Sequence, residues 1–320
     1  MSKLAAYPVV KEYKLEQEYR FQLPALYRKL AEETLRETDE IREHALAQMR
    51  EWIVNNRHIH KVRMDDSFLL RFLRAQKLSV TMACEALERY LTWREMYPTW
   101  SKGSSFQEPI IRQMYDAGGL SVLGQGNDGR TVVLIQTEPF ANWDPTQTVR
   151  FVTMILETLL EWEEVQIGGI LVLLDYTGTS KKLFEIWGMT ELKIVMEGLC
   201  RAYPIQYREV HGALIPKAGI PVAERALSFT PPKFRELVHC HAAVEDLWKH
   251  LEPSITPKKY GGTLDLDAVN KKFADRIEQF QNVVLGLDEM EIDLDHYSAL
   301  WDEQNPDLME AKAFKNLSFD

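Results

Sequence analysis

The chain has 320 residues, of which 45% are apolar and 27% charged, and its formal net charge is -10. This composition is typical of a folded protein of one or two domains with a sizeable core, and it excludes a largely disordered chain. The acidic excess lies at the C-terminal end. Residues 266–320 hold 13 Asp/Glu against 5 Lys/Arg, whereas residues 1–265 hold 35 against 33. Neither part has the broad basic surface that nucleic-acid binding requires.

The three cysteines, Cys84, Cys200 and Cys240, are too few for a disulfide framework and predict a reducing compartment. The chain starts without a secretory signal pattern, and no apolar run approaches the length of about 18 residues that a membrane-spanning helix needs. We therefore expect a cytosolic protein.

The first hundred residues predict an all-α region. Residues 25–56 show apolar positions at helical spacing, which predicts one amphipathic helix. Its apolar stripe consists of Ile41, Ala45, Met49, Trp52 and Ile53. Two further helices follow, one started by Asp65 or Asp66 and one by Ser79, because Asp and Ser are preferred N-cap residues. The pattern predicts a helical bundle ending near Pro98.

Strands alternate with helices in the rest of the chain. The predicted strands are short and apolar, at 121–123, 131–137, 169–175 and 208–215, and the predicted helices lie at 144–164 and within 180–201. Continuous apolar strands separated by helices are typical of a mostly parallel sheet that helices cover. The fold class is therefore α/β with an all-α N-terminal extension.

Residues 124–129, GQGNDG, match the glycine pattern of a dinucleotide-binding loop. Such a loop must open a helix, because the amides at the helix N-terminus hold the pyrophosphate. Here Asn127, Asp128 and Gly129 lead directly into the β-branched strand 131–137. We predict a β-hairpin turn instead, and an NAD-dependent enzyme stays the weakest hypothesis.

Other catalytic patterns are weak, and we expect neither an enzyme nor a metal site. His239 and His241 would share one strand face, but no third ligand stands near them in sequence, so a structural histidine pair is favoured over a metal site. Residues 175–182 contain one glycine, too few for a phosphate loop, and predict a turn in which Thr179 or Ser180 caps the next helix.

Apolar side chains are abundant between residues 151 and 199, and periodicity alone does not separate a packed core from a lipid cavity. Six motifs bear on this choice. They are 66–94 (DSFLLRFLRAQKLSV and then YLTWR), 127–135 (NDGRTVVLI), Trp143-Asp144-Pro145, 169–178 (GILVLLDYTG), Tyr203-Pro204 and 259–262 (KYGG). In this order they resemble the CRAL-TRIO, or Sec14-like, lipid-binding family, and within it the branch of alpha-tocopherol transfer protein and cellular retinaldehyde-binding protein. The resemblance runs from about residue 60 to 265.

The resemblance implies a helical N-terminal region at 1–100, a CRAL-TRIO lipid-binding domain at 108–265 and an acidic C-terminal extension at 266–320. It implies a sheet-floored apolar pocket, closed by a mobile helix, and a monomeric protein that touches membranes only peripherally. Apart from a bound hydrophobic ligand, no cofactor is implied. Whether the acidic extension is a docked helix or a free arm stays open.

The positions that the resemblance assigns to the pocket fall on the predicted strands and helices. They are Val152, Ile155, Leu156, Leu159, Ile170, Leu174, Phe184, Trp187, Val195, Leu199, Ile205 and Val210. Val152 and Leu156 stand where tocopherol carriers have small hydroxyl residues, which implies a more apolar ligand contact. The lid falls at residues 219–229. Its implied residues are Pro221, Val222, Ala223, Ala226 and Leu227.

The tocopherol branch also has a basic cleft for phosphoinositide headgroups. Arg208 and Lys233 match it, with Arg235 close by, whereas Gln206 and other non-basic residues occupy the remaining positions. The leading hypothesis is therefore the binding and transfer of one hydrophobic molecule, such as a retinoid, tocopherol, carotenoid or other isoprenoid, between membranes. The alternative is a phosphoinositide-dependent scaffold or regulator without ligand transfer, in which the acidic tail at 288–310 binds a partner.

Overall fold

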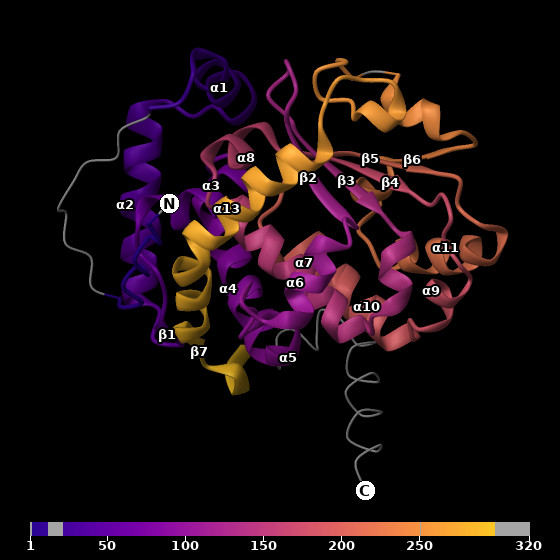
Figure 1. The fold of residues 1–320 in the computed structure, drawn as a ribbon. Helices are drawn as coiled ribbons and strands as arrows, with labels where there is room; N and C mark the ends of the chain where they lie inside the picture. Colours follow the sequence, from indigo (N-terminus) through magenta and orange to yellow (C-terminus); the bar gives the residue numbers. More distant parts are fainter. Residues whose placement is uncertain (1, 12–21, 250, 298–320) are drawn as a thin grey trace, which may run out of the picture.

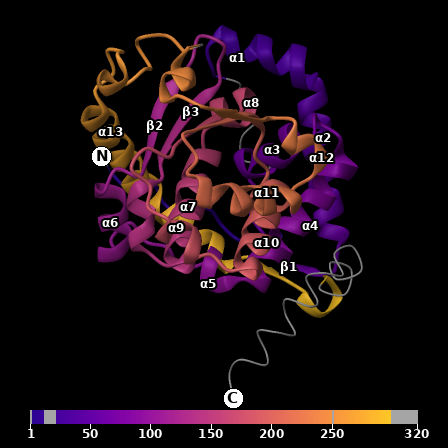
Figure 2. The same ribbon diagram turned by 90° about the vertical axis from the view of Figure 1, so that its right-hand side faces the viewer.

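The computed structural model describes residues 2–11, 22–249 and 251–297 (Figure 1). In Figure 1 the N-terminal helices lie at the left and α9, α10 and α11 lie together at the lower right, below a five-stranded sheet; these three helices face the viewer in Figure 2. The tail at 298–310, which the scaffold hypothesis invokes, lies outside the described residues.

The predicted helix at 25–56 is two segments. α1 (Ala25–Leu30) continues into a π-helical turn, η1 (Ala31–Leu35), and α2 spans Asp39–Asn55. The break lies at Arg36, whose φ of 60° is left-handed, and the side chain of Thr38 then accepts a hydrogen bond from the Ile41 amide to start α2. Four of the predicted stripe residues are buried or half-buried, but Ile41 is exposed in the first turn of α2.

The remaining N-terminal helices follow closely. They are α3 (Asp66–Ala75), α4 (Val80–Met96), α5 (Pro98–Ser101) and α6 (Pro109–Asp116). Asp65 caps α3 through its side chain, as predicted, because its carboxylate accepts from the Phe68 amide. Ser79 occupies the N-cap of α4, but its side chain makes no capping bond. The predicted helical bundle is present, with helices continuing beyond Pro98.

The central sheet has the strand order β2-β3-β4-β5-β6. Its strands are β2 (Leu120–Gln125), β3 (Thr131–Gln136), β4 (Ile170–Asp175), β5 (Tyr207–Ala213) and β6 (Val238–His241). β2 pairs antiparallel with β3, and all other pairs are parallel. The predicted α/β class with a mostly parallel sheet is therefore confirmed.

Helices and short turns connect the strands. They are η2 (Glu138–Asn142), α7 (Pro145–Leu160), α8 (Glu163–Gly168), α9 (Lys182–Glu185), α10 (Met189–Glu197), η3 (Gly198–Ala202), η4 (Lys217–Gly219), α11 (Ile220–Ser228), α12 (Pro232–Arg235), η5 (Val244–Trp248) and η6 (Lys258–Tyr260). Asp144 starts α7 with a capping box shared with Gln147. The predicted helix at 144–164 therefore begins as expected and ends at Leu160, ahead of the separate helix α8.

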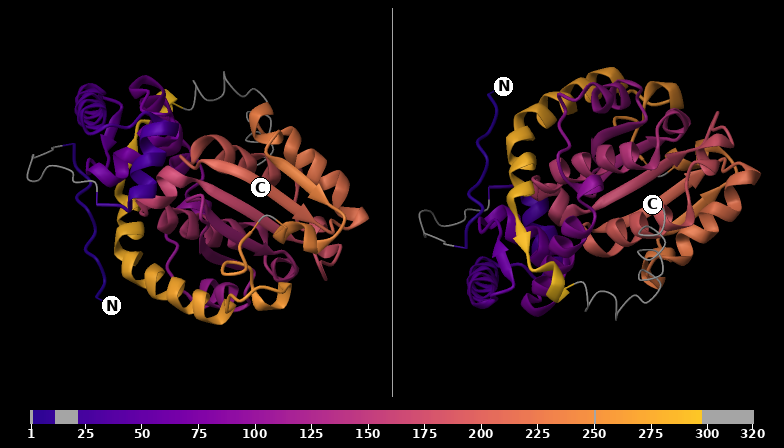
Figure 3. Two further views of the ribbon diagram at one scale, coloured as in Figure 1. Left: turned by 90° about the horizontal axis from the view of Figure 1, so that it is seen from above. Right: turned by 90° about the horizontal axis from the view of Figure 1, so that it is seen from below.

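The C-terminal segment returns to the N-terminal helices. α13 (Leu266–Gly286) runs along the outside of the molecule from the β2 edge of the sheet (Figure 3) and leads through η7 (Leu287–Glu289) to β7 (Glu291–Ile292). β7 pairs antiparallel with β1 (Ile59–Lys61). As far as Tyr297, the acidic extension is thus docked on the body of the protein.

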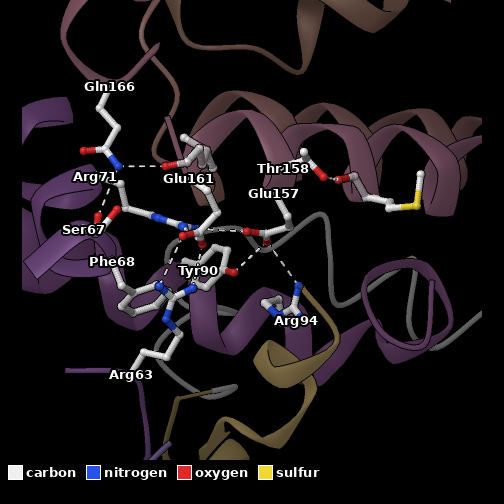
Figure 4. Close-up of polar contacts among 12 residues, drawn as sticks. Arg63, Ser67, Phe68, Arg71, Tyr90, Arg94, Glu157, Thr158, Glu161 and Gln166 are labelled. Carbon is white, nitrogen blue, oxygen red and sulfur yellow. Dashed lines mark hydrogen bonds and ion pairs between the residues drawn. The ribbon is translucent and has the colours of Figure 1, made fainter. Parts of the chain in front are cut away.

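A buried ion network joins the N-terminal helices to α7 (Figure 4). Arg71 of α3 pairs with Glu157 at 3.0 Å and Glu161 at 2.5 Å, and Arg63 pairs with Glu161 at 2.6 Å. Arg94 of α4 also reaches Glu157, at 3.2 Å. These side chains are almost fully buried, so each charge depends on its partners for compensation. The network fixes one side of α7, and the other side is free to line a cavity.

Candidate ligand-binding site

A cavity of about 310 Å³ lies between α7, the sheet and α11. The strands and the turn after β5 contribute Leu120, Val133, Ile135, Ile170, Val172, Leu174, Tyr207, Val210, Gly212, Ile215, Val238 and Cys240. The helices and the ends of β4 and η3 contribute Val152, Ile155, Leu156, Leu159, Tyr176, Met196, Leu199, Cys200, Ala223, Ala226, Leu227 and Phe234. The volume is at the lower end of the range for small-molecule sites.

Alternation along β4 explains how the sheet forms the floor. Ile170, Val172 and Leu174 point into the cavity, whereas Leu171 and Leu173 point to the opposite face and pack in a separate core cluster under η5. Val172 and Leu174 are only half-buried although they lie on a central strand. The exposed part of these two side chains faces the cavity and not the outer surface.

The chemistry of the lining is almost purely apolar. It contains no charged side chain and no amide side chain. The polar atoms come from two thiols and the hydroxyls of Tyr176 and Tyr207. Burial raises the pKa of Tyr176 to about 12, and burial also raises the pKa of Cys200 to about 12, so both groups stay protonated at neutral pH. Such a cavity suits an uncharged hydrophobic molecule.

The structure places eight of the twelve predicted pocket residues on the cavity. They are Val152, Ile155, Leu156, Leu159, Ile170, Leu174, Leu199 and Val210. The four from α7 lie on one face, because positions separated by three, four and seven residues share a helix face. Val152 and Leu156 are both on the wall, where the resemblance implied an apolar contact.

Four predicted residues lie outside the lining. Phe184 sits one layer out, where its ring stacks on Tyr176 with the centroids 6.3 Å apart. Val195 is buried in the core, one position before Met196, which faces the cavity instead. Trp187 and Ile205 pack against the main core from loops. Resemblance located the right segments here, but a shift of one helical position turns a side chain by about 100°.

Some lining residues were missed although the sequence carried a usable pattern for them. Val133 and Ile135 alternate on the predicted strand 131–137, and Val172 completes the series of Ile170 and Leu174. Strand period alone would have found them. Phe234 and Cys240 had no such pattern, because they reach the cavity only through the placement of α12 and the short edge strand β6.

α11 forms one wall at the predicted lid position. Ala223, Ala226 and Leu227 share a helix face and line the cavity, whereas Pro221 lies in the first turn and is exposed. Val222 is half-buried and does not line the cavity. No residue of α11 is fully buried. The helix therefore covers the cavity with little anchoring of its own.

Comparison with known proteins bears on this site. Residues 116–262, which include β2 to β6, α7 and α11, match the family model described as CRAL/TRIO domain. The chain therefore contains a CRAL/TRIO domain.

Two relatives extend the similarity beyond that domain. Clavesin-1 of Mus musculus is 29% identical over 237 residues, which cover 72% of this chain and 66% of clavesin-1, just under two thirds of its length. Alpha-tocopherol transfer protein-like of Homo sapiens is 29% identical over 237 residues, covering 73% of this chain and 69% of that protein. The crystal structure of Sfh5 overlaps with a TM-score of 0.49 at 14% identity, over 79% of this chain and 93% of that chain.

The motif residues of the CRAL/TRIO domain hold its strands and connections in place. The hydroxyl of Tyr260, in the KYGG motif, donates to the carboxylate of Asp175 at the end of β4, and the Tyr260 ring stacks on Trp248 at 4.4 Å. Gly124 and Gln125 end β2, and residues 126–130 form the turn of the β2–β3 hairpin, in which the Gly126 amide donates to the Arg130 carbonyl. The predicted hairpin is confirmed.

The basic residues of the predicted cleft have different surroundings. Arg208 donates to the backbone carbonyls of Gly168 at 2.9 Å and Ile167 at 3.0 Å, so its guanidinium holds the end of α8. Lys233 and Arg235 are exposed on α12, and Arg235 also donates to the Thr230 carbonyl. Gln206 donates to the carbonyls of Arg74 and Gln166.

The predicted histidine pair and the predicted turn at 175–182 lie outside the cavity lining, apart from Tyr176. His239 and His241 share one face of β6, as predicted, and join His211 there. In the described part of the chain, no group of three His, Cys, Asp or Glu side chains is arranged to hold a metal ion. Neither Thr179 nor Ser180 caps α9; Lys181 occupies its N-cap, and the Thr179 hydroxyl instead lies 2.5 Å from that of Thr137.

None of the helices within residues 2–11, 22–249 and 251–297 is long and apolar enough to cross a bilayer.

Proposed function

We propose that the protein binds one uncharged hydrophobic molecule in the cavity of its CRAL/TRIO domain and carries it between membranes. The observation that carries this proposal is the lining itself, which encloses about 310 Å³ without a charged or amide side chain. A ligand of about 20 carbons exposed to water would cost on the order of 15 kcal/mol at about 0.8 kcal/mol per methylene, so a carrier must enclose nearly all of it. Retinoids, tocopherols, carotenoids and other isoprenoids have this chemistry.

α11 is the element that opens in this proposal. It lacks a fully buried residue, and segments with few buried contacts open at low free-energy cost. Its cavity-facing residues are two alanines and a leucine, so its movement exposes little apolar surface. A mobile α11 would give the ligand a path out of the cavity without disturbing the sheet or α7.

The surface around α11 supports contact with a membrane. Within residues 83–249 and 251–297, the exposed large hydrophobic side chains are Met189, Leu214 and Ile220, which are 47%, 40% and 44% exposed. Met189 and Ile220 are the first residues of α10 and α11, which contact each other, and Leu214 directly follows β5. Figure 2 shows α10 beside α11. Exposed apolar side chains on these elements can enter the interface of a bilayer and lower the barrier to ligand exit.

Charge favours the same orientation. Residues 181–236 hold nine Lys/Arg and six Asp/Glu, a balance of +3, whereas the remainder of the chain holds 29 against 42, a balance of -13. A locally positive segment on an acidic protein turns toward anionic lipids. Lys233 and Arg235 on α12, together with Arg208 on β5, are the residues proposed for a phosphoinositide headgroup.

Transfer of a fluorescent retinoid or tocopherol between donor and acceptor liposomes tests the carrier function. Val172→Trp fills the cavity from its floor and should reduce transfer to the uncatalysed rate, whereas Val54→Trp, on the exposed surface of α2, should leave it unchanged. Absence of transfer by the wild-type protein, for any of the ligand classes named above, would refute the proposal. Liposome binding that persists in Val172→Trp without any transfer would instead support the scaffold function.

The membrane contact has its own test. Ile220→Asp and Met189→Asp should slow transfer severalfold and leave ligand affinity in solution unchanged, because neither side chain lines the cavity. Val54→Asp, an equally exposed change remote from the lid, is the matched control. Addition of phosphatidylinositol bisphosphate to the vesicles should accelerate transfer, and Lys233→Gln with Arg235→Gln should abolish that acceleration. An unchanged rate in all these variants would contradict the proposed orientation.

A further inference from the structure

A second cavity, of about 220 Å³, lies between α13, the edge strand β2 and the junction of α7 and α8. We call it the α13 cavity. It shares no lining residue with the cavity described above. Its volume is smaller than that of sites for drug-sized ligands, so an occupant must be small.

Part of the wall of the α13 cavity is apolar and aromatic, and Gly124 and Gln125 of β2 complete the strand side. Val122 of β2 packs in the same core as Phe273 of α13, and Val269 and Leu123 also line the cavity. The ring of Trp162 lies against that of Phe273 in an edge-to-face arrangement, with the centroids 5.7 Å apart. Flat apolar molecules pack well against such walls, because aromatic rings pair by stacking or by edge contacts.

Cationic groups stand at the mouth of the α13 cavity. Lys272 and Arg276 are one turn apart on α13, and within the described residues neither forms an ion pair. The Arg276 guanidinium lies 4.6 Å above the Trp162 ring, and its burial there lowers the pKa of Arg276, an effect that Glu164 opposes. An anion bound beside Arg276 would supply the partner that this guanidinium lacks.

The indole nitrogen of Trp162 is buried and has no hydrogen-bond acceptor among the described residues. Because this nitrogen is covered by other atoms, the carboxylate is assigned to Arg276 and Lys272 alone. With Lys272, Arg276 and Glu164 together, the charge around the cavity is +1, which matches a monoanion better than a doubly charged phosphate.

We propose that the α13 cavity binds a small aromatic carboxylate, with its ring between Phe273 and the β2 side chains and its carboxylate at Arg276 and Lys272. Guanidinium groups bind planar carboxylates in a bidentate fashion, and an adjacent ammonium group adds a second charged donor. The site is separate from the lipid cavity, and the proposal stands whether or not the protein carries a lipid.

Naphthalene-2-carboxylate is a suitable probe, and naphthalene-2-carboxamide is its neutral control of the same shape. Isothermal titration and tryptophan fluorescence would measure both. The Val172→Trp variant excludes binding in the lipid cavity, because that side chain fills it. We expect one carboxylate per chain in wild type and in Val172→Trp, and binding of the carboxamide about tenfold or more weaker, as expected for loss of a charge-assisted pair.

Substitutions at the cavity test the assigned contacts. Arg276→Gln should weaken carboxylate binding about tenfold or more and leave carboxamide binding unchanged. Arg112→Gln is the matched control, because Arg112 is also an exposed arginine whose guanidinium lies over an aromatic ring, that of Phe106 at 4.9 Å. Equal affinity for the two probes, an unaffected Arg276→Gln variant, or no carboxylate binding to the wild-type protein would overturn the proposal.

Discussion

Gly129 and Gly168 bring the β2–β3 hairpin and the end of α8 into backbone contact. A Cβ atom at Gly168 would lie 2.0 Å from the Gly129 carbonyl oxygen, and Gly129 itself has a φ of 81°. The Tyr27 hydroxyl donates to the same carbonyl, at 3.2 Å. The glycine of the NDGR motif is therefore required by a close approach of two segments and by a left-handed turn.

Gly168→Ala should destabilise the protein by at least about 2 kcal/mol, because the added methyl group meets backbone atoms that cannot move aside. Gly212→Ala is the control, since its Cβ would lie 3.6 Å from the nearest atom, an ordinary contact. Urea unfolding measures both. Equal unfolding midpoints for the two variants would show that the contact between Gly129 and Gly168 is not needed.

His211 is held by a chain of polar contacts on the face of β5 and β6 that points away from the lipid cavity. Its Nε2 lies 3.0 Å from Glu209, and its Nδ1 lies 2.9 Å from Nε2 of His241. Glu209 is paired with Arg130, and the His239 ring lies 4.9 Å from the His211 ring. The pKa of Asp246 of η5 is lowered by its bond to Lys249 and also by His241. Burial, with the two neighbouring histidines, lowers the pKa of His211, although Glu209 opposes this.

A lowered pKa in the folded state means that the unfolded chain takes up the proton first. The free energy of unfolding should therefore be constant above the ordinary histidine pKa of 6.5 and fall as the pH drops from there toward the lowered pKa. His211→Gln should flatten this slope between about pH 7 and 5, whereas His44→Gln, on the exposed face of α2, should keep it. An unchanged slope in His211→Gln would assign the pH dependence to other groups.

At the scale of elements, α7 has two functional faces. One carries Glu157 and Glu161 into the ion network with α3 and α4, and the other carries Ile155 and Leu159 into the lipid cavity. The Tyr90 hydroxyl also donates to Glu157, at 2.6 Å. The network therefore sets the position of a cavity wall, which links the N-terminal helices to ligand binding.

Glu157→Leu should lower the free energy of unfolding by about 3–5 kcal/mol, because it removes the acceptor of the buried Tyr90 hydroxyl and leaves Arg71 and Arg94 with one carboxylate each, Glu161 and Asp288. Glu33→Leu, which removes an exposed carboxylate 3.9 Å from Lys29, should cost less than about 1 kcal/mol. Thermal unfolding measures the difference. A loss at Glu157 no larger than that at Glu33 would mean that the network does not hold α7.

The predictability of these elements from sequence was uneven for physical reasons. Strands such as 131–137 and the capped start of α7 at Asp144 are specified locally, by β-branched runs and by a capping side chain. The break at Arg36 was not predicted, because an arginine with a left-handed backbone cannot be distinguished by residue type from the helical residues around it. The prediction for Val195 identified the correct helix, α10, but not the direction of its side chain. That direction depends on how α10 packs against the rest of the protein.

On the scale of the whole molecule, the resemblance predicted the layers but not how the ends of the chain close the fold. The pairing of β7 with β1 joins segments more than 200 residues apart, and the sequence of neither short strand predicts which strand it pairs with. The α13 cavity was likewise beyond sequence analysis, since it exists only because α13 crosses the edge of the sheet at β2. Long-range packing decided both features.

Ligand binding should stabilise the whole fold, because an enclosed ligand binds the folded chain and not the unfolded one. At a free concentration 100 times its Kd, a ligand adds about 2.7 kcal/mol to the free energy of unfolding. Retinol or alpha-tocopherol, whichever binds, should therefore raise the Tm of the wild-type protein by several degrees and leave that of Val172→Trp unchanged. An equal rise in both proteins would place the binding outside the lipid cavity.

The central claim is that the lipid cavity holds one hydrophobic molecule. Native mass spectrometry of the protein isolated from the cells that make it, compared with Val172→Trp produced in the same cells, tests this most directly. We predict a single uncharged hydrophobic ligand per wild-type chain, released by solvent extraction and absent from the variant. A wild-type protein that carries no such ligand, or a variant that carries the same one, would contradict the claim.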